Sequence, residues 1–266
     1  MFKITDNNSF LFAYLNHFYS VYQPKKGTQN TVALKRVFRL FEIMLSYYSR
    51  VFLVRIDLHP QAFSVDNKVT SLFLKMFIAK LENQYQCKVG YFCAREQTKA
   101  YEPDKPYKQH YHLVLLLSGH KAMLPHNILI QLQADWAQHC QGSVYFVDKP
   151  YYMIHRGDKA SINPAIYRIS YLTKNHTKEH NKPANSYLCN EIKLRAKYKG
   201  NSNNEHLLVD PVITHRTKQQ ELKYESNIAA YQKPKHFQES NSKIQLHSSK
   251  LLATNILKEN HVTELA

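Results

Sequence analysis

Two histidines separated by one residue are the first candidates for chemistry in this sequence. They form the segment His110-Tyr111-His112, which runs into the apolar stretch 113–117. Side chains two residues apart on a β-strand point to the same face, so both imidazoles could reach one divalent cation. By itself the pair is weak evidence for a metal site, because surface strands also carry two histidines at this spacing by chance.

A carboxylate upstream could complete such a site. Glu96 closes the segment 91–96, which has the composition of a strand, and this strand could lie beside the histidines. Two imidazoles and one carboxylate suit Mg²⁺ or Mn²⁺ and leave positions open for a phosphate oxygen. The alternative is a surface carboxylate that pairs with Arg95.

Downstream, two tyrosines and a lysine are expected to share one polar helix face. At about 100° per residue, Tyr167 and Tyr171 lie about 40° apart, and Lys174 lies about 60° from Tyr171. A tyrosine phenolate is a competent nucleophile toward a phosphodiester, and Lys174 could stabilise it while steadying the phosphate. The alternative is that both tyrosines are core aromatics with solvated hydroxyls.

The charge of the whole chain indicates an anionic partner. The formal net charge is +16, the sequence pI is about 9.5, and 19 residues are tyrosine. Cationic groups hold phosphates while aromatic faces stack on exposed bases, so a single-stranded nucleic acid is the expected ligand. The alternative is a solvated basic surface without a specific partner.

Several classes of protein are not expected. The four cysteines form no Cys-x-x-Cys pair, which argues against a zinc ribbon or a disulfide framework and favours a reducing cytoplasm. Polar residues precede the first apolar patch, and no uncharged apolar run approaches about 20 residues, so we expect neither a signal peptide nor a membrane span. None of the six glycines lies in a P-loop pattern, so a separate helicase would have to unwind DNA.

The elements that must position these residues follow from the apolar periodicity. It predicts helices over residues 31–48, 69–84, 127–140 and 164–176, and strands over residues 52–59, 88–97, 110–117 and 144–152. Asn163 is expected to cap the last helix, with Pro164 in its first position. This order indicates an α+β fold, a two-layer sandwich in which helices cover a mostly antiparallel sheet.

One main domain is expected over residues 30–198. Pro24, Gly27 and the lysines between them read as a linker that separates the N-terminal segment 1–29. Residues 199–266 are polar, with scattered leucines and isoleucines, so they are expected to form a basic tail that is largely disordered. Such a tail would add electrostatic affinity for DNA rather than chemistry.

Together these segments resemble the inovirus gene-2-like family, which includes the C-terminal domains of the prophage proteins YagK and YfjJ. A hydrophobic strand, a two-histidine strand and a Tyr-x-x-Lys helix follow each other as do the three motifs of HUH-type rolling-circle replication initiators. The matching segments are residues 48–58, 94–97, 110–112 and 170–174, within a similarity that covers about residues 30–195.

The resemblance implies an HUH-endonuclease sheet with the histidines on a central strand and the tyrosine helix across the site. It implies that His110 and His112 are metal ligands with Glu96 as a third, and that Tyr171 is the nucleophile with Lys174 beside it. Tyr167 remains a second candidate, because some initiators use two tyrosines on one helix.

The implied activity is nicking and joining of single-stranded or hairpin DNA through a phosphotyrosine, which initiates rolling-circle replication of a phage or prophage-type element. A relaxase or transposase would use the same chemistry, and a regulator on this scaffold would bind DNA without cutting it. Arg55, Asp57 and His59 share one face of the first-motif strand. We expect them to support the site or the DNA rather than to bind metal.

Overall fold

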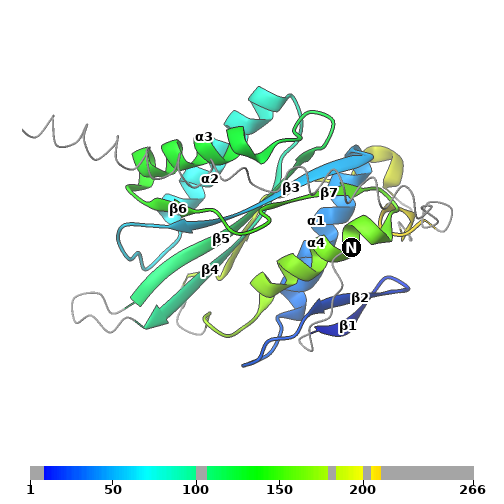
Figure 1. Cartoon of the computed structure of the whole chain (residues 1–266), viewed down its shortest axis with the longest axis horizontal. Coiled ribbons are helices and arrows are strands. Elements are labelled where there is room, and N and C mark those ends of the chain that lie inside the picture. The colour runs from blue at the N-terminus through cyan, green and yellow to red at the C-terminus, as the bar shows by residue number, and fades with distance from the viewer. Residues whose placement is uncertain (1–8, 100–106, 179–183, 200–204, 211–266) are drawn as a thin grey trace, which may run out of the picture. The chain divides into compact units, whose positions relative to one another are not determined.

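The architecture is an antiparallel sheet with helices on both faces, seen in the computed structural model in Figure 1. The structure describes residues 9–99, 107–178, 184–199 and 205–210, all within one unit, Phe2–His215. Its elements are β1 (Ser9–Tyr14), β2 (His17–Tyr22), α1 (Thr31–Tyr47), β3 (Arg50–His59), α2 (Lys68–Tyr85), β4 (Gly90–Lys99), β5 (Tyr107–Ser118), α3 (Pro125–Cys140), β6 (Ser143–Tyr145), β7 (Tyr151–His155), α4 (Lys159–Ser170), η1 (Tyr171–Thr173), β8 (Tyr187–Cys189), η2 (Ala196–Tyr198) and η3 (Glu205–Leu207).

The main sheet has six strands in the order β6-β3-β5-β4-β8, and β7 also pairs with β3. Every pair is antiparallel, which confirms the predicted α+β sandwich with an antiparallel sheet. The two-histidine strand β5 is central, flanked by β3 and β4. Residues 51–58 of β3 are all buried, as expected for a strand covered on both faces.

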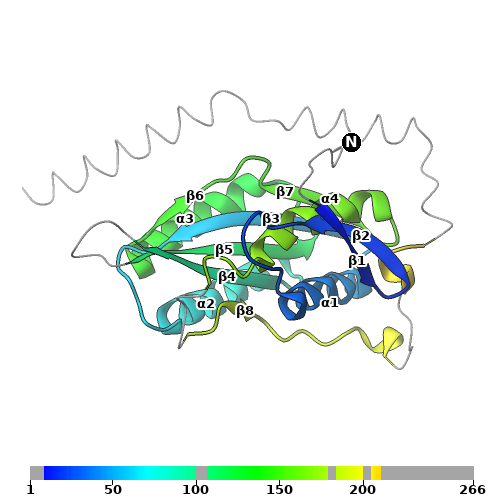
Figure 2. The same cartoon turned by 90° about the horizontal axis from the view of Figure 1, so that it is seen from below.

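The helices lie in two layers, one on each face of the sheet, rather than in the single covering layer that the sequence suggested. One hydrophobic cluster joins α1 and α4 to one face, and a second joins α2 and α3 to the other (Figures 1 and 2). The inner strands are apolar on both sides, so each face needs its own helical cover. None of the described helices is both long and apolar enough to cross a membrane.

The strand predicted over residues 144–152 is interrupted, and this prediction is wrong as stated. Two short strands, β6 and β7, both pair with β3, and residues 146–150 loop out between them. Pro150 has no N–H to give to the ladder, and Lys149 adopts a left-handed backbone with φ of 51°. Five residues of this edge therefore span only the Arg55–Ile56 pair of β3.

The last helix also begins and ends earlier than predicted. Asp158 caps it, because its carboxylate accepts a bond from the Ala160 N–H at 3.2 Å. Asn163 and Pro164 therefore lie inside α4, and the predicted start at Asn163 is wrong. A proline here lacks one intrahelical bond, but burial of the apolar face offsets that cost. That face consists of Ile162, Ala165, Ile166 and Ile169.

The segment before the predicted linker packs against the rest of the unit. β1 and β2 form a hairpin whose Tyr19 and Val21 are fully buried in the cluster that contains α1 and α4. Figure 2 shows the hairpin over these two helices. Beyond the expected domain end, Leu207 and Leu208 are buried in the same cluster. The rest of the predicted tail lies, for the most part, outside the described residues.

Candidate metal centre and tyrosine site

The three predicted metal ligands converge on one point of the sheet. Glu96 on β4 lies directly opposite His110 on β5, and His112 is two residues further along the same face. Their ligand atoms all lie within 4.8 Å of one another. Glu96 Oε2 is 3.7 Å from His110 Nε2 and 3.6 Å from His112 Nε2. This group could hold a metal ion, as the sequence predicted.

The two distances from Glu96 to the imidazoles are compatible with ligands of a small divalent cation. Ligand bonds of about 2.1 Å place adjacent corners of an octahedron about 3 Å apart and opposite corners about 4.2 Å apart. The two carboxylate-to-imidazole distances lie between these values. Glu96 and His112 are almost fully buried, whereas the His110 side chain is 22% exposed. The group therefore offers one open side, where a substrate oxygen and water could complete the coordination.

Asp57 on β3 fixes the orientation of the His112 ring. Its Oδ1 lies 2.6 Å from His112 Nδ1, and a carboxylate can only accept, so Nδ1–H donates and Nε2 turns toward Glu96. Burial tends to raise the pKa of Asp57, but the bond from His112 and the Arg55 charge at 3.6 Å hold it below its ordinary value. A carboxylate behind a ligating histidine is the usual support of a metal site.

Burial and neighbouring charges shift the pKa values of the two histidines in opposite directions. Burial, together with the neighbouring His112, lowers the pKa of His110 to about 4, so this ring is neutral at pH 7 and has a lone pair to give. Burial also disfavours charge on His112, yet its bond to Asp57 and the nearby Glu96 carboxylate raise its pKa above the ordinary value. A metal ion bound to His112 Nε2 would therefore take the place of a proton.

Two lysines neutralise Glu96. Lys178 Nζ donates to Glu96 Oε1 at 2.8 Å, and Lys174 Nζ lies 3.4 Å from Oε2. Burial alone would raise the pKa of Glu96, but the bond from His112 and these two ammonium groups hold it far below its ordinary value. Because Lys178 holds one oxygen, the other oxygen is left facing both imidazoles.

Tyr171 lies at the edge of this group. Its ring centre is 6.3 Å from that of His112, 5.6 Å from Arg55 Cζ and 3.7 Å from Lys174 Nζ. Tyr171 belongs to the short 3₁₀ turn η1, which follows α4, rather than to the α-helix that the sequence predicted. The tighter turn also makes Lys174 the first extended residue after it, and Lys174 thereby reaches both Tyr171 and Glu96.

Tyr167 lies on the last full turn of α4, and Tyr22 from β2 contacts both candidate tyrosines. The Tyr22 ring meets Tyr171 edge to face at 5.0 Å and Tyr167 edge to face at 6.4 Å. The contact with His112 and the two cationic contacts given above belong to Tyr171. These contacts place Tyr171 beside the candidate metal ligands.

The residues before α1 hold the turn that carries Tyr171. The Gln29 amide donates to the Ser170 carbonyl at 2.6 Å, and the Asn30 N–H donates to the Thr173 carbonyl at 2.8 Å. The Tyr22 N–H donates to the Ser170 hydroxyl at 2.8 Å. We call residues 22–30 the strap. The sequence predicted only the end of a separate segment and a linker in this region. An irregular segment has no periodic pattern from which its contacts could be predicted.

Besides the strap, Lys178 is a residue of the site that could not be predicted from the sequence. It follows Lys174 by four residues, but η1 has ended by then, so helical periodicity could not place it beside Glu96. The Gln97 N–H donates to the Thr177 carbonyl at 2.9 Å, which brings this loop alongside β4. This contact and the bonds from Asn175 to Thr28 are long-range, and they place the Lys178 ammonium on the carboxylate.

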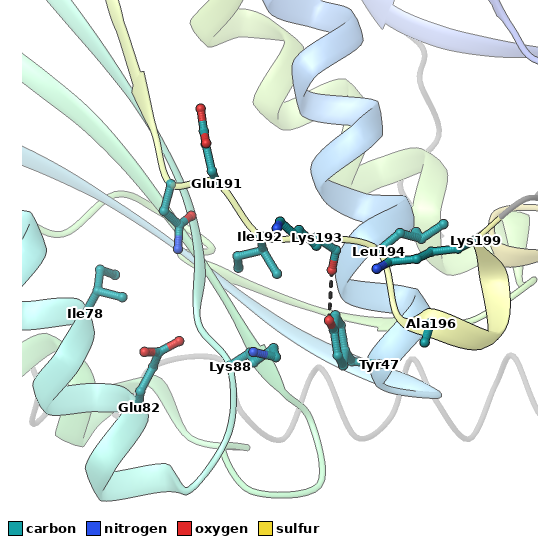
Figure 3. A pocket seen from close by; sticks show the side chains of 11 residues that line it. Tyr47, Ile78, Glu82, Lys88, Glu191, Ile192, Lys193, Leu194, Ala196 and Lys199 are labelled. Atoms are coloured by element: carbon teal, nitrogen blue, oxygen red, sulfur yellow. Dashed lines mark hydrogen bonds between the residues drawn. The ribbon is translucent and has the colours of Figure 1, made fainter.

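A separate hollow of about 620 Å³ lies where α1 and α2 approach the segment after β8. Figure 3 shows Glu82 and Lys88 on one side of it and Lys193 on the other, where the Lys193 carbonyl accepts a bond from the Tyr47 hydroxyl at 2.8 Å. None of the six predicted site residues lines it. The hollow is therefore distinct from the metal centre.

Comparison with known proteins gives one family. No curated protein and no solved structure matches the chain. The model of the YagK/YfjJ C-terminal domain matches residues 13–190, a span that contains the candidate metal centre, Tyr171, β2 and the strap. This agrees with the resemblance carried by the histidine and tyrosine motifs. The chain belongs to the YagK/YfjJ C-terminal domain family.

Proposed function

We propose that this protein cuts and rejoins single-stranded DNA through a covalent bond to Tyr171. The observation that carries the proposal is the position of Lys174, whose ammonium lies 3.7 Å from the Tyr171 ring centre and 3.4 Å from Glu96 Oε2. One cation thus joins the candidate nucleophile to the candidate metal ligands. A structural tyrosine would not need this link.

The chemistry is an exchange of phosphodiesters. The Tyr171 hydroxyl loses its proton as its oxygen attacks phosphorus in line, the bond from phosphorus to the 3′ oxygen breaks, and that oxygen takes up one proton and leaves as a 3′-hydroxyl. The 5′ side of the strand stays on the tyrosine as a phosphodiester. Because the bond energy is kept, a later 3′-hydroxyl reverses the reaction and joins the strand without ATP.

The residues around Tyr171 have separate tasks in this scheme. Glu96, His110 and His112 would hold Mg²⁺ or Mn²⁺, which supplies a Lewis acid that draws charge from a non-bridging phosphate oxygen. Lys174 stabilises the phenolate and the charge that develops on the phosphate. Asp57 holds His112 in the orientation that presents Nε2 to the cation site.

The biological setting we propose is initiation of rolling-circle replication of a phage or prophage-type element. The order of the three motifs supports it, as does the family, which includes prophage proteins. DNA would be presented as a single strand or an extruded hairpin, and a separate helicase would unwind the duplex. The net charge of +16 suits a strand of phosphates.

The test is formation of a covalent adduct. Purified protein is incubated with labelled single-stranded DNA from phage-type origins and Mn²⁺, and adducts are resolved on a denaturing gel. We expect an adduct with the wild type that is lost in Tyr171→Phe. Tyr47→Phe, which removes a hydroxyl at the hollow of Figure 3, is the matched control and should react normally.

Tyr167→Phe decides between the two tyrosines, with folding and DNA binding checked for each variant. An adduct formed at the normal rate by Tyr171→Phe, together with its loss in Tyr167→Phe, would reverse the assignment. A protein that binds these strands with Mn²⁺ present and never forms an adduct would instead be a DNA-binding regulator on the same scaffold.

A further inference from the structure

Two arginines from different elements lie against the loop 146–150: the Arg55 N–H donates to the Pro150 carbonyl, and the Arg168 side chain donates to the Asp148 carbonyl. Arg55 projects from β3, with its guanidinium carbon 5.6 Å from the Tyr171 ring centre. Arg168 belongs to the last turn of α4. Burial lowers the pKa of Arg55, and repulsion by the positive charge of Arg168 also acts to lower it. Burial raises the pKa of Tyr152, and the positive charges of both arginines act in the opposite direction.

The carboxylate that pairs with Arg55 also serves another group. Arg55 shares Asp57 at 3.6 Å, but the same carboxylate oxygen accepts the 2.6 Å bond from His112. Arg168 donates to the neutral main-chain carbonyl of Asp148 at 3.1 Å, in the loop that interrupts the edge strand. Arg55 therefore shares its carboxylate with a candidate metal ligand, and the bond of Arg168 is to a neutral acceptor.

Each arginine also keeps a donor without an acceptor. The Nε groups of Arg55 and Arg168 are buried and make no hydrogen bond with the described residues. The Arg55 side chain as a whole is only 6% exposed, on a strand whose neighbouring positions are apolar. Buried N–H groups of charged side chains are costly to leave unpaired, so a site of this kind is suited to receive an anion.

We infer that Arg55 and Arg168 form a binding site for a backbone phosphodiester of the DNA strand, beside Tyr171. A guanidinium presents its donors in a planar fork that matches two phosphate oxygens, which explains the use of arginine rather than lysine. One singly charged phosphodiester would supply negative charge and acceptors for the unpaired donors. The inference rests on the proposed function, because it takes the anion to be part of the strand that Tyr171 attacks.

Strand binding without metal tests the site separately from catalysis. Affinity for a labelled polythymidylate strand is measured over a series of salt concentrations in the presence of a chelator. For Arg168→Gln we expect about tenfold weaker binding and a salt slope smaller by about 0.7, the amount for one lost contact to a single-stranded phosphate. Arg36→Gln, which removes an exposed arginine from α1, is the matched control and should change both far less.

Charge and geometry are separated by a second variant. Arg168→Lys keeps the cation but loses the fork, so the salt slope should stay close to wild type while binding weakens by about twofold to fivefold. Arg55→Lys should behave in the same way. Because it keeps the positive charge on the buried strand, it tests Arg55 even if a neutral side chain at this position prevents folding. An Arg168→Gln protein with the affinity and slope of Arg36→Gln would overturn the inference.

The two proposals fail in different ways. If Arg168→Gln shows the expected loss but no variant or wild type forms an adduct with Mn²⁺, the phosphate site stands and the nicking activity does not. If the wild type forms the adduct and Arg168→Gln binds and reacts as the control does, nicking stands and the phosphate site does not.

Discussion

Asp57 fixes which nitrogen of His112 faces Glu96, so we expect a substitution of Asp57 to weaken metal binding. Asp57→Asn keeps the shape but removes the charge that holds the ring. We expect metal affinity to fall by about 10- to 100-fold, the usual range for this support. Calorimetric titration with Mn²⁺ measures it. Asp135→Asn, which removes a surface carboxylate paired with Lys80, is the control.

Glu96 is expected to contribute both to the stability of the fold and to metal binding, because it pairs with two lysines and belongs to the candidate metal group. Glu96→Gln leaves Lys178 and Lys174 buried without their anion, so we expect a loss of about 3 to 5 kcal/mol in the free energy of unfolding without metal. Urea unfolding measures this loss. Mn²⁺ at about 100 times its dissociation constant should add about 2.7 kcal/mol to the wild type and nothing to the variant.

A double variant checks the cause of that loss. Glu96→Gln with Lys178→Met removes the unpaired ammonium as well and should recover part of the stability, although not the metal binding. Equal stability of the single and the double variant would show that the unpaired charge is not what destabilises the protein.

At this scale much of the site could be predicted from sequence. The period of a strand places His110 and His112 on one face, and the antiparallel return of β4 beside β5 places Glu96 opposite them. Lys178 could not be predicted, because it reaches Glu96 through a loop whose path depends on long-range bonds to Thr28 and to β4.

At the scale of elements, the strap holds the turn that carries Tyr171 in register with the sheet. Gln29→Ala removes the bond to the Ser170 carbonyl, so we expect the rate of adduct formation to fall several-fold, a stability loss of about 1 kcal/mol, and unchanged Mn²⁺ affinity. Single-turnover kinetics and the Mn²⁺ titration measure this. The exposed Gln23 lies in the same strap, and Gln23→Ala should leave all three quantities unchanged.

The elements themselves were predictable where periodicity is strong. The first three helices and the first three strands of the prediction lie within three residues of α1, α2, α3, β3, β4 and β5. The errors occur where a local feature overrides the pattern. Asp158 caps α4 earlier than expected, and Pro150 interrupts the edge of the sheet. The pairs that build the β1–β2 hairpin depend on packing that no local pattern reports.

At the scale of the whole molecule, most of the positive charge lies before residue 211. The residues after Asp210 contain eight lysines and arginines and five glutamates, a net +3 out of +16. A chain truncated after Asp210 should therefore bind single-stranded DNA only slightly more weakly, with the largest difference at low salt, and should still form the adduct. Gel-shift and adduct assays measure both. Normal binding with complete loss of cleavage would mean that the removed residues belong to the active site.

The two ammonium groups on Glu96 give the centre its own counterions. Since Lys174 and Lys178 already balance the carboxylate, the protein has no need of a bound metal to keep this buried charge from destabilising the fold. An incoming ion has to outcompete groups of charge +1 that are already in place. Coulomb attraction scales with charge, so a potassium or sodium ion gains little by that exchange and a divalent ion gains much more. The two lysines therefore favour binding of a divalent ion over a monovalent ion at this site, and the ligand geometry adds a preference for ion size.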